Sequence, residues 1–336
     1  MSANAKDVHG MTEDQIQHRL NQKAARTSLM TQLLPYAGIV VLSLVFQILT
    51  NGRFLAPENL RLLLNQSFDM CVVMCGAVFL YALGNLDMAV GAVMALAACV
   101  LTRTFKMGLP LPFAFIIGII TAVAAMSVTA LVKNKLRIQP FIGSWCVMSI
   151  ASGIVVVVYK TVGKEGISFP YSEASWLDSS VVKIATLAVM LIIGYILFNR
   201  TAIGKSMKAI AGGEMVARIS GIRIEKMTWA AYALAGVAIG IAALFALVRG
   251  GVADTSIGAG LNLNIMIGIV LGGFPLSGGA NARFGAPFVG ALTVTVLTNG
   301  LAFIGLSNAI GYAIKGAIFL IVVGLTYEKS KGKLIN

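Results

Sequence analysis

Three ionisable residues lie within or at the edge of long apolar stretches: Asp69, Asp87 and Lys315. Charged groups are costly in such surroundings and usually have a function there. Asp87 lies between Gly84 and Gly91, which predicts a carboxylate that caps backbone amides at a break between two helices. Contact with a bound solute is the alternative role. Lys315 lies near the end of its stretch, where a lysine can reach water, and an Asp69–Lys315 ion pair is a further hypothesis.

Neutral amides and hydroxyls occur along the same stretches. Their hydrogen bonds are weak and replaceable, which suits a path for an uncharged polyol, although the same side chains could instead join neighbouring helices. The candidates for a polar path are Asn65, Gln66, Asn85, Asp87, Asn262, Asn264, Ser277 and Asn299.

The sequence lacks the residue sets of an enzyme or a metal centre. Cys71 and Cys75 are one helical turn apart, but His9 and His18 lie in the polar N-terminus, so no metal-ligand set is complete. All four cysteines are expected to be buried free thiols. With no nucleophile–base pair either, we expect no catalytic residue, no metal and no cofactor in this chain.

Two segments look like nucleotide-binding motifs. Gly204-Lys205-Ser206 ends like a P-loop, but Asn199 stands where that motif needs its first glycine. Leu276–Gly279 resembles the signature of ATP-binding-cassette (ABC) ATPases, yet it lies between two apolar stretches. If ATP drives this protein, a partner must bind ATP with Mg²⁺ and hydrolyse it.

The elements that carry these residues belong to a membrane protein. Hydrophobic residues make up 58% of the 336 residues and charged residues 12%, whereas a soluble domain is about 45–50% apolar and about 25% charged. Gly236 and Gly240, like Gly268 and Gly272, stand four apart, a spacing that lets membrane helices approach closely.

Lipid offers no partner to free backbone groups, so the spans should be helices of about 20 residues each. The sequence predicts an all-α polytopic bundle of about ten spans within residues 32–328, between a cytoplasmic segment 1–31 and a tail 329–336. The third and eighth spans are short. The predicted spans are Leu33–Thr50, Leu60–Leu83, Met88–Thr102, Leu111–Val132, Pro140–Tyr159, Val181–Phe198, Thr228–Val248, Leu261–Phe274, Ala286–Gly305 and Ala309–Tyr327.

The basic residues are distributed unevenly between the two sides of this arrangement. With the N-terminus inside, 17 Lys and Arg lie on the inner side and 8 on the outer side, and Lys315 lies in a span. This asymmetry predicts both termini in the cytoplasm. It also accounts for the net charge of +13 without nucleic-acid binding.

Two segments, Leu83–Ala92 and Leu271–Ala280, interrupt apolar stretches with glycine and polar residues and resemble each other. Paired breaks in the two halves of a transporter point to a transport site. Chance similarity among small residues is the alternative. The ten-span count puts both breaks on the same side, which does not suit an inverted repeat.

The longest inner loop, about residues 199–226, is basic. Its segment Gly204–Ile222 resembles the cytoplasmic coupling loop of bacterial ABC sugar permeases of the ribose/galactoside/arabinose/xylose class, whose pattern is roughly G-x-x-x-x-A-I-G-G-N-x-x-A-A-x-x-S-G-I. A basic loop that only fixes topology is the alternative. Ala217, Ser220, Gly221 and Ile222 match, while Ala211, Glu214 and Val216 depart. The resemblance implies an ATPase contact that includes Gly204, Ala209, Gly212, Gly213, Glu214, Ala217, Arg218, Ser220 and Gly221.

Gly84–Gly91 and Gly272–Gly279 are similar to two further elements of this family, and the resemblance runs from Leu33 to Tyr327. It implies a multi-pass permease subunit of the bacterial inner membrane. That subunit would pair with a second copy, an ABC ATPase and a solute-binding protein to import a monosaccharide. A nucleoside, a furanose signal molecule or a branched-chain amino acid is the alternative cargo, and an ion-coupled secondary transporter is the alternative mechanism.

Overall fold

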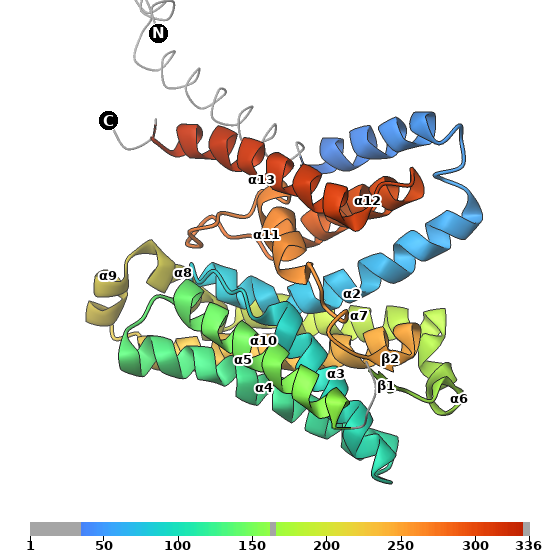
Figure 1. The fold of residues 1–336 in the computed structure, drawn as a ribbon. Helices are drawn as coiled ribbons and strands as arrows, with labels where there is room; N and C mark the ends of the chain where they lie inside the picture. The colour runs from blue at the N-terminus through green and yellow to red at the C-terminus, as the bar shows by residue number, and fades with distance from the viewer. Residues whose placement is uncertain (1–34, 162–165, 332–336) are drawn as a thin grey trace, which may run out of the picture.

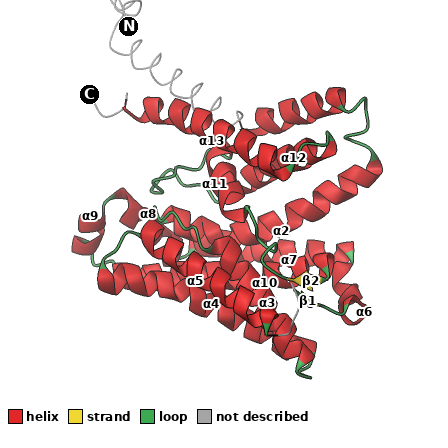
Figure 2. Cartoon of the chain, viewed as in Figure 1, coloured by secondary structure: helices red, strands yellow, loops and turns green. Residues whose placement is uncertain are grey.

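The computed structural model describes residues 35–161 and 166–331, and most of these residues are helical (Figures 1 and 2). The predicted segment 1–31 and residues 332–336 of the predicted tail lie outside this part. The long and intermediate helices are Pro35–Leu49, α2 (Pro57–Ala82), α3 (Val90–Lys106), α4 (Leu111–Leu136), α5 (Pro140–Lys160), α7 (Ser180–Tyr195), α10 (Ile224–Gly250), α11 (Leu261–Leu271), α12 (Ala286–Phe303) and α13 (Asn308–Lys331).

Local sequence explains where several of these helices begin and end. Proline occupies the first or second position of α2, α4, α5 and α12, because its fixed φ suits a helix start and its missing N–H is not needed there. Glycine in the left-handed conformation follows the last residue of α10, at Gly251.

Six helices are long and apolar enough to cross a membrane: α2, α4, α5, α7 together with η2 (Ile196–Arg200), α10 and α12. The helix Pro35–Leu49, α11 and the part of α13 over Ala309–Gly324 are apolar but shorter, and α3 has 17 residues. The prediction of a helical, multi-pass membrane protein is therefore confirmed. The count of about ten spans stays a prediction.

Two sets of short elements lie at opposite ends of the molecule (Figure 1). At one end are α8 (Ala202–Gly212) and α9 (Glu214–Ile219). At the other are α6 (Tyr171–Ala174), η1 (Ser175–Asp178) and a two-stranded antiparallel sheet of β1 (Ile167–Ser168) and β2 (Val252–Ala253). These strands are the only departure from an all-α fold in the described part of the chain, and they join the loop before α7 to the loop after α10.

Small residues allow the central helices to pack closely around α10. A β-carbon added at Gly236 would lie 2.6 Å from the α-carbon of Val123 on α4, and one at Gly240 would lie 2.7 Å from that of Ile119. On α2, Gly76 is equally close to α10, where its β-carbon would lie 2.8 Å from the α-carbon of Ala235. The glycine spacing on α10 therefore has the helix-packing role that the sequence predicted.

The two resembling breaks end their helices with the same turn. After α2, Gly84 has φ of 73°, and after α11, Gly273 has φ of 77°. In both cases the residue after the glycine donates its N–H to the carbonyl five residues earlier, at 3.0 Å, which is a Schellman turn. The structural correspondence is thus Gly84 with Gly273, one residue away from the sequence match of Gly84 with Gly272.

The same two breaks are packed against each other. The N–H of Gly279 donates to the carbonyl of Ala82 at 3.4 Å. A β-carbon at Gly84 would lie 2.8 Å from the carbonyl oxygen of Ser277. The resembling segments therefore meet at one place in the fold, where each leaves room for the other's backbone.

Candidate functional site

The loop between α2 and α3 is held by buried polar side chains. Asp87 is 1% exposed, and its Oδ1 accepts a hydrogen bond from the N–H of Ala89 at 2.8 Å. From α11, Asn262 accepts from the N–H of Gly91 at 2.8 Å through Oδ1 and donates through Nδ2 to the carbonyl of Met88. Asp87 therefore binds a backbone N–H at the break before α3, which fits the prediction that it caps amides there.

The loop is also fixed to the neighbouring helices α4 and α5. Lys133 Nζ donates to Asn85 Oδ1 at 2.9 Å, and the N–H of Met88 donates to Ser144 Oγ at 3.0 Å. Asn85 is buried. Together with Asp87 and Asn262, it positions the start of α3.

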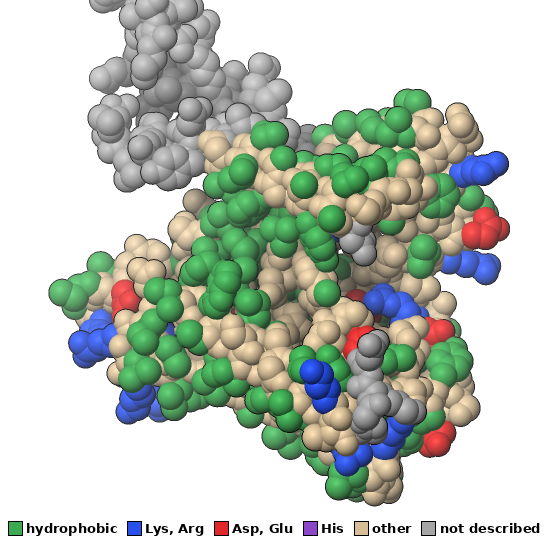
Figure 3. Space-filling view, in the orientation of Figure 1, with side chains coloured by type: hydrophobic (Ala, Val, Ile, Leu, Met, Phe, Trp, Pro, Cys, Tyr) green, Lys and Arg blue, Asp and Glu red, His purple; other side chains and the backbone are tan. Residues whose placement is uncertain are grey.

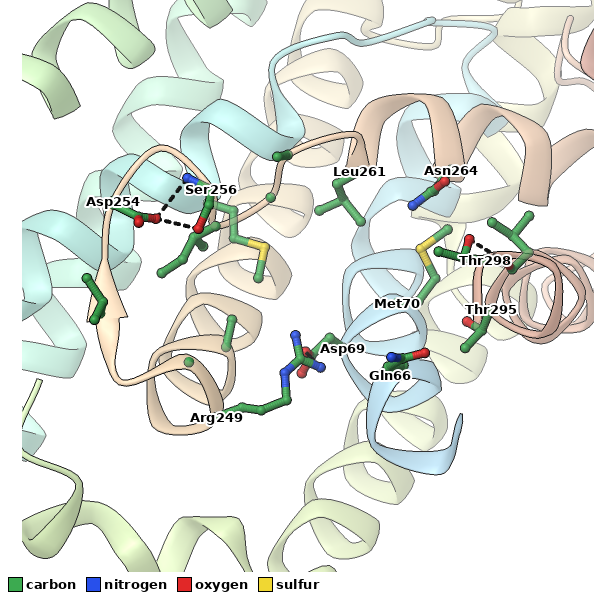
Figure 4. A pocket seen from close by; sticks show the side chains of 18 residues that line it. Gln66, Asp69, Met70, Arg249, Asp254, Ser256, Leu261, Asn264, Thr295 and Thr298 are labelled. Atoms are coloured by element: carbon green, nitrogen blue, oxygen red, sulfur yellow. Dashed lines mark hydrogen bonds and ion pairs between the residues drawn. The ribbon is translucent and has the colours of Figure 1, made fainter. Parts of the chain in front are cut away.

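A cavity of about 560 Å³ lies between α2, α3, α10, the loop after β2, α11 and α12. Figure 3 shows a hollow on this face of the molecule, and Figure 4 shows side chains from the different elements pointing into the cavity. Apolar side chains such as Met70, Met94 and Leu261 share the lining with polar ones. The polar lining residues are Gln66, Asp69, Arg249, Asp254, Ser256, Asn264, Thr295 and Thr298.

An ion pair forms one wall of the cavity. Arg249 Nη1 lies 2.5 Å from Asp69 Oδ2, with the Arg249 side chain 43% exposed and the Asp69 side chain 14% exposed. Arg249 Nη1 also donates to the carbonyl of Asn65 at 3.5 Å. The pair links α2 to the end of α10. The hypothesis of an Asp69–Lys315 ion pair is therefore wrong.

Lys315 instead belongs to the opposite side of the cavity. Its Nζ donates to Asn264 Oδ1 at 3.1 Å and lies 5.4 Å from the ring centre of Tyr312. The residue is 4% exposed, so it does not extend to water as the sequence suggested. Its hydrogen bond orients the amide of Asn264, which lines the cavity.

The remaining polar groups of this side come from α12. Thr295 and Thr298 donate their hydroxyl hydrogens to the carbonyls of Ala291 and Val294, both at 2.8 Å. Asn299 Nδ2 donates to Gln66 Oε1 at 3.4 Å and so joins α12 to α2.

Only some of the residues predicted for the polar path line the cavity. Gln66 and Asn264 line the cavity, and Asn299 touches Gln66. Asn65 lies beside the cavity, bonded to Lys183, whereas Ser277 is exposed in the loop between α11 and α12. Five lining residues were not predicted from the sequence: Arg249, Asp254, Ser256, Thr295 and Thr298. The position of Arg249 directly after an apolar stretch was the one available signal, because the intramembrane Asp69 needed a cationic partner.

A polar network connects the cavity wall to the end of the molecule that carries η1. Lys183 is buried in the first turn of α7, and its Nζ donates to Asp178 Oδ1 at 2.6 Å and to Asn65 Oδ1 at 2.8 Å. The hydroxyl of Tyr171 donates to Asp178 Oδ2 at 3.1 Å. The hydrogen bond from Lys183 is the main reason why the pKa of Asp178 lies below its ordinary value.

The predicted coupling segment forms the two short helices α8 and α9. Thr201 caps α8 by accepting from the N–H of Ile203 at 3.2 Å. Gly204 and Ala217 are buried, so they position the segment and do not present a surface. The other predicted residues are exposed or half-buried: Ala209, Gly212, Gly213, Glu214, Arg218, Ser220 and Gly221.

Large apolar side chains on α9 are exposed. Met215 is 74% exposed, Val216 69% and Ile219 81%. Beside them, Arg218 and Glu214 form a salt bridge of 3.6 Å. These three apolar residues were not predicted from the sequence, because the family pattern is defined by the small residues and glycines of the segment.

The described residues hold no group of three His, Cys, Asp or Glu side chains that could bind a metal ion. Cys71, Cys75 and Cys99 are buried free thiols, as predicted, but Cys146 is exposed. Cys146 lies on α5, which buries little of its surface against other helices, so the prediction of four buried thiols is wrong at this position.

The chain is similar to proteins that import sugars. It is 29% identical over 305 residues to the ribose import permease protein RbsC of Bacillus subtilis. The matched region covers 90% of this chain and 94% of that protein. It is 28% identical to the galactose/methyl galactoside import permease protein MglC of Salmonella typhimurium, over 91% and 96% of the two chains. It is 24% identical to the fructose import permease protein FrcC of Rhizobium meliloti, over 95% and 90%.

No solved structure matches the chain. A protein family described as branched-chain amino acid transport system / permease component matches residues 59–323, which include every helix from α3 to α12. Because this match covers most of the chain, the protein belongs to that family of transport permeases.

Proposed function

We propose that this chain is the membrane-spanning subunit of an ABC importer for a monosaccharide. The observation that carries the proposal is the extent of the similarity: the ribose, galactose and fructose permeases each match at least 90% of this chain and of their own length. All three are named for neutral sugars. The cavity, lined by amides, hydroxyls and one ion pair, suits such a cargo.

The same proposal includes the location of this subunit and its partner proteins. The permease lies in the bacterial inner membrane with about ten spans and both termini in the cytoplasm, and it pairs with a second copy. A solute-binding protein delivers the sugar on the outer side, at the end that carries α6 and η1. A partner ATPase holds ATP and Mg²⁺ and supplies the energy, so this chain is not itself an enzyme.

We assign the ATPase contact to α8 and α9. Apolar side chains as exposed as Met215, Val216 and Ile219 indicate a surface that another protein covers. This surface lies at one end of the molecule (Figure 1), on the side that the charge asymmetry assigns to the cytoplasm. Exposed Lys205 and Arg223 beside it favour an acidic partner surface.

Uptake of labelled sugar tests both parts of the proposal. Deleting this gene should abolish ATP-dependent uptake of ribose, galactose or fructose, and the wild-type gene should restore it. Val216→Asp should not restore uptake and should lose the copurifying ATPase, at unchanged protein level in the membrane. Ile138→Asp, which places the same charge in the α4–α5 loop, is the control and should restore uptake.

Unchanged uptake of every sugar in the deletion strain would contradict the sugar importer. Branched-chain amino acids are the second candidate cargo, because the family description names them. Labelled leucine in the same assay separates the two. Uptake that survives loss of ATP and collapses with the ion gradient would instead favour a secondary transporter.

A further inference from the structure

We propose that Asp69 and Arg249 form a recognition site in the permease itself, which binds neutral polyols and rejects sugars that carry an acid or phosphate group. This inference rests on the proposed sugar import and adds the chemical class of the cargo. Asp69 and Arg249 lie side by side in the cavity wall, 2.5 Å apart, with the Arg249 side chain directed into the cavity (Figure 4).

The ion pair leaves hydrogen-bonding capacity for a ligand. Both contacts of Arg249 within the described residues use Nη1, at Asp69 and at the carbonyl of Asn65. The guanidinium has further N–H donors in a planar fork, and a carboxylate has two acceptor oxygens. A guanidinium beside a carboxylate therefore offers adjacent donors and acceptors, which match neighbouring hydroxyls that each donate and accept.

The facing wall complements this arrangement. The hydroxyl hydrogens of Thr295 and Thr298 are used on backbone carbonyls, so their oxygens remain as acceptors. Lys315 donates a hydrogen bond to Asn264 Oδ1, and Asn299 donates one to Gln66 Oε1. The side-chain N–H groups of Asn264 and Gln66 therefore remain as donors for a ligand. Each amide is oriented by a residue behind it, and the polar groups of the site are thus positioned before any ligand binds.

The charge of the cavity selects against anions. Arg249 and Asp69 neutralise each other, and the ammonium of Lys315, bonded to Asn264 behind the lining, is balanced by the carboxylate of Asp254, which accepts hydrogen bonds from Ser256. An anionic sugar would add an unbalanced negative charge to this site or would have to take Arg249 from Asp69. A neutral polyol meets neither cost, because it needs no counter-charge.

The size and the apolar part of the lining also suit a small ring. A cavity of about 560 Å³ falls within the range of about 300–1,000 Å³ of small-molecule pockets. Met70, Met94 and Leu261 offer apolar surface to the C–H face of a sugar. Few strong contacts and spare room are properties of a site that releases its ligand readily.

Equilibrium binding of labelled galactose and ribose to the full chain in lipid nanodiscs tests the proposal. We expect the wild type to bind weakly, with a dissociation constant of about 1–10 mM. Galacturonate and ribose 5-phosphate should compete at least tenfold less well than the neutral sugars. Arg249→Gln should weaken sugar binding at least tenfold, whereas Arg53→Gln, an exposed arginine outside the cavity, should bind as the wild type does.

Asp69→Asn provides a gain of function that misfolding cannot imitate. It leaves Arg249 without its counter-charge, so galacturonate and ribose 5-phosphate should compete at least tenfold better than against the wild type. If the anions compete no better with Asp69→Asn, the charge-based selection is refuted. If wild-type protein binds no sugar while cells still import it, the site is refuted and the proposed function stands. If the gene deletion leaves sugar uptake intact, the proposed function itself fails.

Discussion

Asp178 and Lys183 join the loop before α7 to α2, and their ion pair gives the protein a stability term that depends on pH. Lys183 lowers the pKa of Asp178 below its ordinary value of 3.8, so the folded state holds this proton less tightly than the unfolded state. The stabilisation is present above pH 3.8 and is lost as the pH falls through the lower folded value. Because the Asp178 side chain is 39% exposed, solvent screens part of the effect.

The expected result is a smaller acid-induced decrease of the melting temperature in Asp178→Asn than in the wild type, measured in detergent between about pH 5 and about pH 3. The variant should also melt lower at neutral pH, because Lys183 is buried and loses its charged partner. Glu173→Gln in the same loop is the control and should follow the wild type. Identical acid sensitivity in Asp178→Asn would contradict the role of the pair.

Asp87 allows the contribution of one buried acceptor to be measured. Asp87→Ala removes the acceptor for the N–H of Ala89 and should lower the free energy of unfolding by about 1 kcal/mol, measured by denaturation in mixed micelles. Asp87→Asn keeps an acceptor and removes the charge, so it should cost less. If both variants cost the same, the negative charge and not the hydrogen bond accounts for the effect.

For single residues, the sequence predicted only those roles that depend on neighbouring residues in the chain. The capping role of Asp87 followed from its flanking glycines. The partner of Asp69 did not, because Arg249 is 180 positions away and nothing near Asp69 in the sequence indicates which span faces it. Arg249 counted as a residue of the outer side, and only the packing of α2 against α10 brings it to the acid.

At the scale of elements, the contact between the two helix breaks depends on glycine. Gly278 has φ of 68°, and a β-carbon there would lie 2.6 Å from the carbonyl oxygen of Tyr81. Gly278→Ala should therefore combine about 1–2 kcal/mol of left-handed backbone strain with about 1–3 kcal/mol of overpacking. Mixed-micelle denaturation and sugar uptake are the measurements, and both should decrease.

Gly108→Ala is the matched control for this contact. Gly108 also has a positive φ, 96°, but a β-carbon there would meet nothing within 4 Å. It should show the backbone strain without the overpacking. Equal costs at the two positions would mean that the contact between the breaks contributes nothing beyond backbone conformation.

The sequence predicted both breaks but not their contact, and it placed their correspondence one residue off. A sequence match among small residues does not determine which residue of one break corresponds to which residue of the other. The hydrogen bonds of the two Schellman turns determine it. The coupling segment shows a similar limit. Its basic residues and glycines are visible in the sequence, but the burial of Ala217 and the exposure of Met215, Val216 and Ile219 depend on how α9 lies against the rest of the molecule.

For the whole molecule, the distribution of charge makes a prediction about orientation. Figure 3 shows hydrophobic side chains over much of one face, with Lys and Arg at its ends and also beside the hollow. The ten-span prediction puts 17 Lys and Arg on the side of α8 and α9 and 8 on the side of η1, so α8 and α9 should face the cytoplasm. The sugar would then enter at the end where Arg249 and Asp69 line the cavity.

Labelling of single cysteines with a membrane-impermeant maleimide on intact cells tests this orientation. The background is Cys146→Ser, which removes the exposed native thiol while the other three described cysteines are buried. Met107→Cys, in the exposed turn after α3, should be labelled from outside. Ile219→Cys on α9 should be labelled only after the membrane is opened. Labelling of Ile219→Cys in intact cells would reverse the assigned orientation, and it would place the apolar surface of α9 where no ATPase could reach it.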